Sequence, residues 1–269
     1  MKLRIRFTKT GLIKFVGHLD FMRTFQKIVA RSGISPIYSA GFNPHMEMSF
    51  ASPLGVGAES LGDYVDLEAG YRVPEGVSIV EKQRLDLMGY VNEEFPDVPS
   101  ERFLLDTLNE ASVEGVKFLG VRRITEDGKA SRAMAVVRNA AYEIRLSGFS
   151  PDKREQIEQV WLSLSDETEI NILKKTKKSE KLVNIRPLIH SAGIGRSSYR
   201  TVLTPDEDEN DLILNLVCAS GSTENLKPET LMDVFFEKLN FAEEPHADIL
   251  RIDLMTEDLR SLGELGVKL

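Results

Sequence analysis

The chain has 269 residues, of which 42% are hydrophobic and 28% charged, and its formal net charge is −8. This composition is typical of a soluble globular protein with two domains, and no apolar run approaches the roughly 20 residues that a membrane-spanning helix needs. The single cysteine, Cys218, excludes an internal disulfide, a cysteine zinc site and an iron–sulfur cluster held by this chain's own thiolates. The first residues alternate charge with hydrophobe and do not form a secretory signal, so we expect a cytoplasmic protein with no membrane partner.

The predicted elements of the first half follow the order β-α-β-β-α-β. Period-two alternation predicts the strands, and helical spacing followed by Gly33 predicts the end of the first helix. The elements are a strand over 2–8, a helix over 19–32, strands over 46–50 and 63–68, a helix that Ser100 caps, and a strand over 116–123. Residues 70–99 are punctuated by Gly and Pro and are interpreted as an insertion.

The second half repeats this order of elements. Its elements are a strand over 140–148, a helix over 150–161, strands over 168–175 and 211–219, a helix over 227–239 and a strand over 247–255. The connection between the two middle strands is too long for an ordinary loop and is therefore expected to be functional or mobile. The sequence thus predicts an α+β fold of two tandem ferredoxin-like domains. They are residues 1–133, with the insertion at about 70–99, and residues 134–269, with a basic loop at about 174–200.

Basic residues are concentrated in two segments of an otherwise acidic chain. Residues 1–35 hold eight Lys and Arg against one acid, and residues 168–200 hold eight against two. Such segments are typical of a surface that meets a polyanion, although an acidic chain is not expected to bind nucleic acids indiscriminately. The candidate RNA-binding residues are Arg4, Arg6, Arg23, Lys27, Lys174, Lys175, Lys177, Lys178 and Arg186.

The first strand offers a specific place for such a surface. If its apolar side chains are buried, Arg4 and Arg6 project from the opposite face, next to Tyr64 and Asp66 of a neighbouring strand. This face could bind single-stranded RNA through phosphate contacts and base stacking. Alternatively, it could form a cross-strand lattice of salt bridges or be covered by the second domain.

Two histidines and an acid are the candidate catalytic residues. His18 opens the first helix, and His45 follows the Asn43-Pro44 turn in the stretch GFNPHMEMSFASP. Together with Asp20 they could form a general acid–base pair or a sparse metal site. Alternatively, His18 forms a hydrogen bond at the helix start and His45 is a turn residue. No recognisable metal-ligand spacing is present, so no metal ligand is assigned, and the familiar enzyme motifs are absent.

Several segments resemble the uncharacterised radical-SAM-linked domain family of bacteria. They are RFTKTG, KFVGHLDFMRTFQKIVARSGI, GFNPHMEMSFASPLGVGAES, AMAVVRNAAYEIRL, KKTKKSEKLVNIRPLI and NLKPE. The resemblance implies a radical-SAM protein as partner, which would carry the iron–sulfur cluster and S-adenosylmethionine, and an RNA-related setting involving tRNA, rRNA or the ribosome. It assigns no reaction. The family usually has serine where this chain has Gly17, and proline and a basic residue where it has Met46 and Glu47.

Three functions follow as hypotheses. The first is a non-catalytic RNA-binding or substrate-presenting adaptor for a radical-SAM enzyme, in which His18, Asp20 and His45 shape a pocket. The second is a metal-independent endoribonuclease with His18 or His45 as general base, by analogy of fold with the CRISPR repeat-processing endoribonucleases. The third is a protein–protein scaffold that does not bind RNA.

Overall fold

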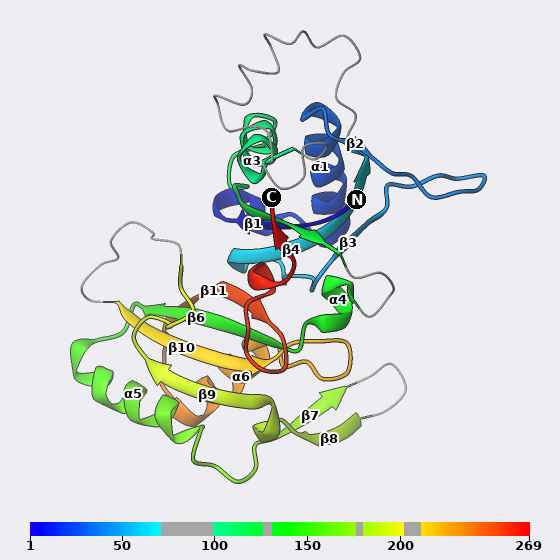
Figure 1. Ribbon diagram of the computed structural model, residues 1–269. Coiled ribbons are helices and arrows are strands. Elements are labelled where there is room, and N and C mark those ends of the chain that lie inside the picture. The colour runs from blue at the N-terminus through cyan, green and yellow to red at the C-terminus, as the bar shows by residue number, and fades with distance from the viewer. Residues whose placement is uncertain (71–98, 126–130, 176–179, 202–210) are drawn as a thin grey trace, which may run out of the picture. The chain divides into compact units, whose positions relative to one another are not determined.

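The computed structural model describes residues 1–269 except 71–98, 126–130, 176–179 and 202–210 (Figure 1). These residues form two compact units, Met1–Val137 with Arg260–Leu269, and Arg138–Leu259. The predicted insertion at about 70–99 lies almost wholly outside the described residues. In the part of the chain that the structure describes, no helix combines the length and the apolar character needed to cross a membrane.

The first unit packs helices on an antiparallel sheet. The sheet has the order β12-β5-β1-β4, and two short strands, β2 and β3, also pair with β4. The strands are β1 (Lys2–Lys9), β2 (Ser35–Pro36), β3 (Met48–Phe50), β4 (Glu59–Gly70), β5 (Phe118–Ile124) and β12 (Val267–Lys268). The helices are α1 (His18–Arg31), α3 (Glu101–Glu110) and the short α4 (Ala133–Val136), with 3₁₀ turns at Gly11–Phe15 and Leu262–Glu264.

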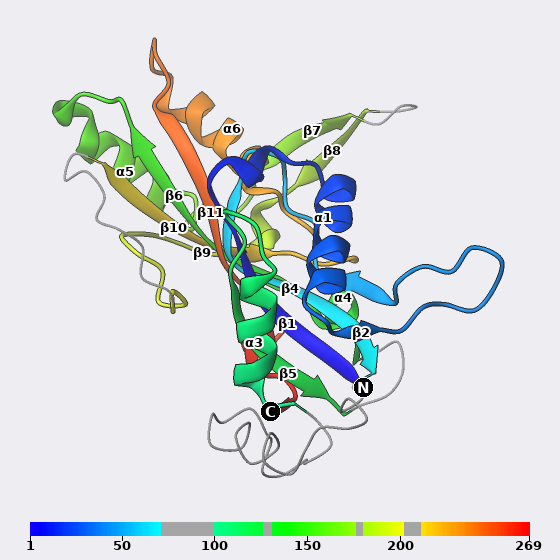
Figure 2. The ribbon, with the colours of Figure 1, turned by 90° about the horizontal axis from the view of Figure 1, so that it is seen from above.

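The core of the first unit follows the predicted periodicities. Leu3, Ile5 and Phe7 of β1 are fully buried, as the alternation predicted. The ring of Phe7 lies 5.5 Å from that of Phe25 on α1, and α3 contributes Leu104 to the same core. Figure 2 shows both helices beside β1. Ser100 caps α3 as predicted, because its hydroxyl accepts a hydrogen bond from the amide of the third helical residue.

The second unit contains a four-stranded antiparallel sheet of order β11-β6-β10-β9, a separate two-stranded hairpin and two helices. The strands are β6 (Asn139–Ser147), β7 (Asn171–Lys175), β8 (Glu180–Asn184), β9 (Ile189–Ile194), β10 (Leu212–Ala219) and β11 (His246–Met255). The helices are α5 (Arg154–Ser163) and α6 (Pro228–Leu239), with 3₁₀ turns at Pro151–Lys153 and Arg186–Leu188. The buried rings of Trp161 on α5 and Phe235 on α6 join the helices edge to face, 5.2 Å apart.

The described part of the stretch predicted as a basic loop at about 174–200 contains strands as well as loop. It includes β8 and β9, and β9, not β7, pairs with β10. The sequence gives no strand signal for β8, because β8 belongs to an exposed hairpin, where neither face is consistently buried and no apolar alternation develops.

The last ten residues differ from the predicted division of the chain. They were expected in the second domain, but Arg260–Leu269 clusters with the first unit. The reason is local pairing, since β12 extends the sheet at β5 and Arg122 donates a hydrogen bond from Nε to the carbonyl of Gly263.

Candidate functional site

Arg4 lies in a buried ion pair. Its Nε and Nη2 donate to the two carboxylate oxygens of Asp66 on β4, at 2.8 and 3.0 Å, and Nη2 also donates to the carbonyl of Ser131 at 2.8 Å. The same carboxylate accepts a hydrogen bond from the amide of Ala133 at the start of α4. Only 2% of Arg4 is exposed. The cross-strand salt bridge is therefore what forms here, and Arg4 has no surface to offer a phosphate.

Arg6 and Tyr64 face each other across β1 and β4, in the predicted register. The guanidinium carbon of Arg6 lies 6.0 Å from the centre of the tyrosine ring. Tyr64 is 1% exposed, and its hydroxyl forms a hydrogen bond with Ser261 at 3.0 Å. A stacked base needs an open aromatic face, so this tyrosine is not a stacking platform in the structure.

The two candidate histidines have different surroundings. The ring of His18 meets the core residue Phe50 edge to face, with centroids 5.3 Å apart. His45 is exposed on the segment between β2 and β3, where Nδ1 lies 2.8 Å from the hydroxyl of Ser39. That hydroxyl also accepts a hydrogen bond from the amide of His45, which holds the turn. Within the described ranges, the two imidazoles form no hydrogen bond with each other.

Asp20 does not join either histidine through any contact that the structure describes. Its carboxylate accepts a hydrogen bond from Arg23 at 2.8 Å, on the exposed face of α1. Across the described residues, no group of three or more His, Cys, Asp or Glu side chains is placed to hold a metal ion. Among the described contacts, His18 packs on Phe50, His45 holds a turn and Asp20 pairs with Arg23, so the three side chains do not come together in one site.

The basic face of α1 is partly used within the unit. Arg23 pairs with Asp20, and Arg31 donates to the carbonyl of Ala111 at 2.6 Å, whereas Lys27 is exposed. The β1 residue Lys9 is buried, with its ammonium donating to the carbonyl of Val16. Much of the amino-terminal positive charge therefore serves the fold.

The hairpin β7–β8 carries exposed basic residues, including Lys174 of the predicted set. Lys174 and Lys181 are exposed and directly opposite each other, and the neighbouring opposite pair is Leu173 and Leu182, which are 53% and 63% exposed. In Figures 1 and 2 the hairpin extends away from the four-stranded sheet of its own unit. The backbone of Lys175 pairs with that of Glu180. Lys177 and Lys178 lie outside the described residues.

Arg186, also predicted to bind RNA, forms hydrogen bonds with the backbone of its own unit. Its guanidinium donates to three backbone carbonyls, those of Ser165, Glu167 and Ile189. These three donated hydrogen bonds use three of the five N–H groups of the guanidinium and fix the segment that follows β8.

The arginines of the stretch GIGRSSYR meet a buried acid. Glu143 on β6 is 2% exposed and accepts hydrogen bonds from the side chain of Arg200 and the amide of Ser197. Arg196 lies within 3.8 Å of the same carboxylate. Glu143 thus anchors the loop that carries Arg196 and Arg200. The sequence did not predict the contact between Glu143 and these arginines, because nothing in the pattern of β6 indicates which residues cover its face.

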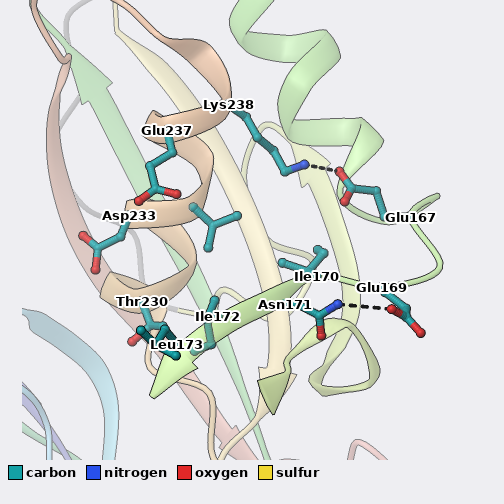
Figure 3. A pocket seen from close by; sticks show the side chains of 11 residues that line it. Glu167, Glu169, Ile170, Asn171, Ile172, Leu173, Thr230, Asp233, Glu237 and Lys238 are labelled. Carbon is teal, nitrogen blue, oxygen red and sulfur yellow. Dashed lines mark hydrogen bonds and ion pairs between the residues drawn. The ribbon is translucent and has the colours of Figure 1, made fainter. Parts of the chain in front are cut away.

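A pocket of about 640 Å³ lies between β7 and α6 (Figure 3). Its walls combine carboxylates with aliphatic side chains. The lining residues are Glu167, Glu169, Ile170, Asn171, Ile172, Leu173, Thr230, Asp233, Val234, Glu237 and Lys238. The ion pair between Lys238 and Glu167, at 2.8 Å, closes one end. The sequence did not predict this pocket, because its acids look like the ordinary solvent face of an amphipathic helix.

A family model matches most of the chain. The family described as "Uncharacterized protein conserved in bacteria (DUF2344)" matches residues 2–83 and 89–228. The chain belongs to this family. The match includes α1, β3 and the hairpin β7–β8, so the predicted site residues all lie within the family region. Among curated proteins, none gives a match.

Several solved structures are distantly similar. A chain of the "Crystal Structure of a Cbf5-Nop10-Gar1 Complex" has a TM-score of 0.46 and 11% identity, over 95% of this chain and 50% of that one. A putative glycine cleavage system transcriptional repressor has a TM-score of 0.21 and 10% identity, over 95% and 98% of the two chains. An unknown protein from Galdieria sulphuraria has a TM-score of 0.23 and 8% identity, over 93% and 98%. The chain spans about half the length of the Cbf5-complex chain, and these scores carry no argument about function.

Proposed function

We propose that the protein is a non-catalytic RNA-binding or substrate-presenting adaptor, and that the hairpin β7–β8 is its RNA contact. The observation behind the proposal is the opposition of Lys174 and Lys181. Like charges directly opposite in an antiparallel pair destabilise the pairing, since their Cβ atoms are only about 5 Å apart. A phosphate between the two ammonium groups would turn this repulsion into two attractions.

The leucine pair beside the lysines supports a macromolecular ligand. An isolated two-stranded hairpin is marginally stable in water, and Leu173 and Leu182 leave apolar surface exposed on it. Successive side chains of a strand point to opposite faces, so the leucines lie on the face opposite the lysines. An RNA that wraps around the edge of the hairpin would meet the lysines with its phosphates and cover the leucines with base or ribose surface. The exposed Lys27 on α1 is a further candidate contact, whereas Arg4 and Arg186 are engaged by internal acceptors.

The partner is proposed from the resemblance to radical-SAM-linked proteins. The partner protein would supply the iron–sulfur cluster and S-adenosylmethionine, because a chain with one cysteine cannot hold a cluster with its own thiolates. The adaptor would bring RNA, or another substrate that the hairpin recognises, to that protein.

We further propose that each unit is a variant of the ferredoxin-like fold. In the first unit the strand order β5-β1-β4-β3 has α1 and α3 in the two crossover connections, and in the second β11-β6-β10-β9 has α5 and α6. Both orders are those of a β-α-β-β-α-β unit. On this proposal the hairpin β7–β8 is an addition to the second unit.

Incubation of the purified chain with labelled single-stranded RNA tests the function. The adaptor predicts binding that weakens as salt rises, with a log–log slope of about −0.7 for each phosphate contacted, and an intact RNA after incubation. Cleavage that His18→Ala or His45→Ala abolishes would instead support the endoribonuclease. Absence of binding at low salt would contradict the adaptor and leave the protein scaffold.

A further inference from the structure

The pocket between β7 and α6 forms a groove along the first three residues of β7 and the two residues before them. Five consecutive residues, 169–173, line it. Successive side chains of a strand point to opposite faces, so five in a row can line one groove only if the groove follows the edge of the strand. The other wall consists of Thr230, Asp233, Val234, Glu237 and Lys238, whose spacing defines one face of α6.

The backbone of β7 has hydrogen-bonding groups on this edge. The amide of Ile185 donates to the carbonyl of Ile170, which makes this pair a hydrogen-bonded one. Hydrogen-bonded and non-hydrogen-bonded pairs alternate along an antiparallel ladder, so the amides and carbonyls of Asn171 and Leu173 point away from β8. Among the described strands, β8 is the only one that pairs with β7. Its outer edge can therefore accept another strand.

The charges of the groove select the ligand. Asp233 and Glu237 are exposed, lie four residues apart on the same helix face, and form no ion pair with any residue in the described ranges. Like charges at this spacing repel each other, and Glu169 adds a third carboxylate. Among the described residues that line the groove, Lys238 is the only cation, and Glu167 already neutralises it. The groove therefore attracts a cationic ligand and repels a nucleic acid.

We propose that this groove binds a basic, extended segment of a partner protein, which adds as a strand to the outer edge of β7. Its backbone would pair with Asn171 and Leu173, and every second side chain, Lys or Arg, would face Asp233 and Glu237. The intervening apolar side chains would pack on Ile172 and Val234. Strand addition of this kind takes affinity from backbone hydrogen bonds and specificity from the alternating side chains. The inference stands apart from RNA binding, because it uses the outer edge of β7 and the acidic face of α6, although Leu173 belongs to both surfaces.

The test uses the full chain and a fluorescent peptide of about nine residues in which Lys and Val alternate, long enough to pair with β7 at about 3.3 Å per residue. We expect the wild type to bind it, and D233K/E237K to weaken binding about tenfold or more. The matched control is E243K/E244K, which changes the net charge equally at exposed acids of the same unit outside the groove. It should bind within about twofold of the wild type.

A second probe isolates the strand edge. The same peptide with alternate backbone amides methylated keeps its charge but cannot donate along one edge, and we expect it to bind about tenfold more weakly. Equal binding of the two peptides, or equal losses in D233K/E237K and E243K/E244K, would overturn the proposal. A concentration-dependent dimer of the wild type that D233K/E237K abolishes would make a second copy the occupant, and would also overturn it.

Discussion

The position of Arg4 in an alternating strand does not determine whether its side chain binds a ligand or forms an internal salt bridge. The pattern of β1 correctly places Arg4 opposite Asp66, but two outcomes, an RNA-binding face and a salt-bridge lattice, follow equally well from that register. The structure contains the salt bridge, with Arg4 held by Asp66 and Ser131. The face of β1 and β4 that carries Arg4 is covered by the backbone of Ser131 and Ala133, which lie more than sixty residues after Asp66 in the sequence. This cover determines that the salt bridge forms instead of an RNA-binding face.

This burial predicts a large loss of stability in Arg4→Ala. Removing the guanidinium leaves the carboxylate of Asp66 buried without its counter-ion, which typically costs about 3–5 kcal/mol in the free energy of unfolding. Urea denaturation measures it. Arg23→Ala, which removes a pair exposed on α1, is the control and should change the free energy of unfolding by less than about 1 kcal/mol. Similar losses in the two variants would show that Arg4 is not held in a buried pair.

Cys218 is predicted to be chemically inert in the folded protein. It is fully buried, and burial, with a smaller contribution from the nearby charge of Glu229, raises the pKa of its thiol to about 12. The thiolate is the reactive form, so raising the pH from 7 to 9 should not expose reactivity in the native state. Titration with a thiol reagent should label the protein only after denaturation. Labelling of the native chain at neutral pH would contradict the buried position.

Among the elements, the periodic segments and strand β7 were predictable, but β8 and its pairing with β7 were not. The predicted helices correspond to α1, α3, α5 and α6. They were predictable because each helix buries one face against a sheet, and that face appears in the sequence as apolar residues at helical spacing. The hairpin β7–β8 buries no consistent face, so its residues show no period, and β9 was hidden in the same stretch. The basic residues of this stretch were identified, but not that Lys174 and Lys181 would be opposite each other.

The turn before β5 offers a test of backbone geometry. Gly115 has φ of +82°, and a Cβ there would lie 2.1 Å from the carbonyl oxygen of Thr10. Gly148 has a similar φ of +76° but nothing within 4 Å of the Cβ position. We expect Gly148→Ala to cost about 1–2 kcal/mol in the free energy of unfolding, the penalty of the left-handed conformation alone. Gly115→Ala should cost clearly more, because the backbone must also move. Equal melting temperatures of the two variants would contradict the close approach.

At the scale of the whole molecule, the acidic chain sets the conditions for RNA binding. The net charge of −8 repels a polyanion, so an RNA contact depends on local clusters of cations. Arg4, Lys9 and Arg31 serve the fold, and Arg186 does the same in the second unit. The sequence could locate the two basic segments, but only tertiary contacts separate the cations that remain exposed, such as Lys27 and Lys174, from those already used.

The candidate site was only partly predictable, because its residues come from separate segments of the chain. His18 and His45 were identified from motif and turn, yet their neighbours, Phe50 and Ser39, depend on how separate segments meet. The groove beside β7 combines a strand edge with one helix face about sixty residues further along the chain. No periodicity within either segment indicates that pairing.

Charge reversal of the hairpin tests directly whether Lys174 and Lys181 contact RNA. Fluorescence anisotropy with labelled single-stranded RNA, over a salt series, compares the wild type, K174E/K181E and the control K117E/K268E. The control reverses two exposed lysines of the first unit and changes the net charge equally.

The account predicts that K174E/K181E binds about tenfold or more weakly than the control, and that its salt slope is smaller by about 1.4, or about 0.7 for each of two lost phosphate contacts. Equal affinities and equal slopes for K174E/K181E and K117E/K268E would contradict the assignment of the hairpin as the RNA contact.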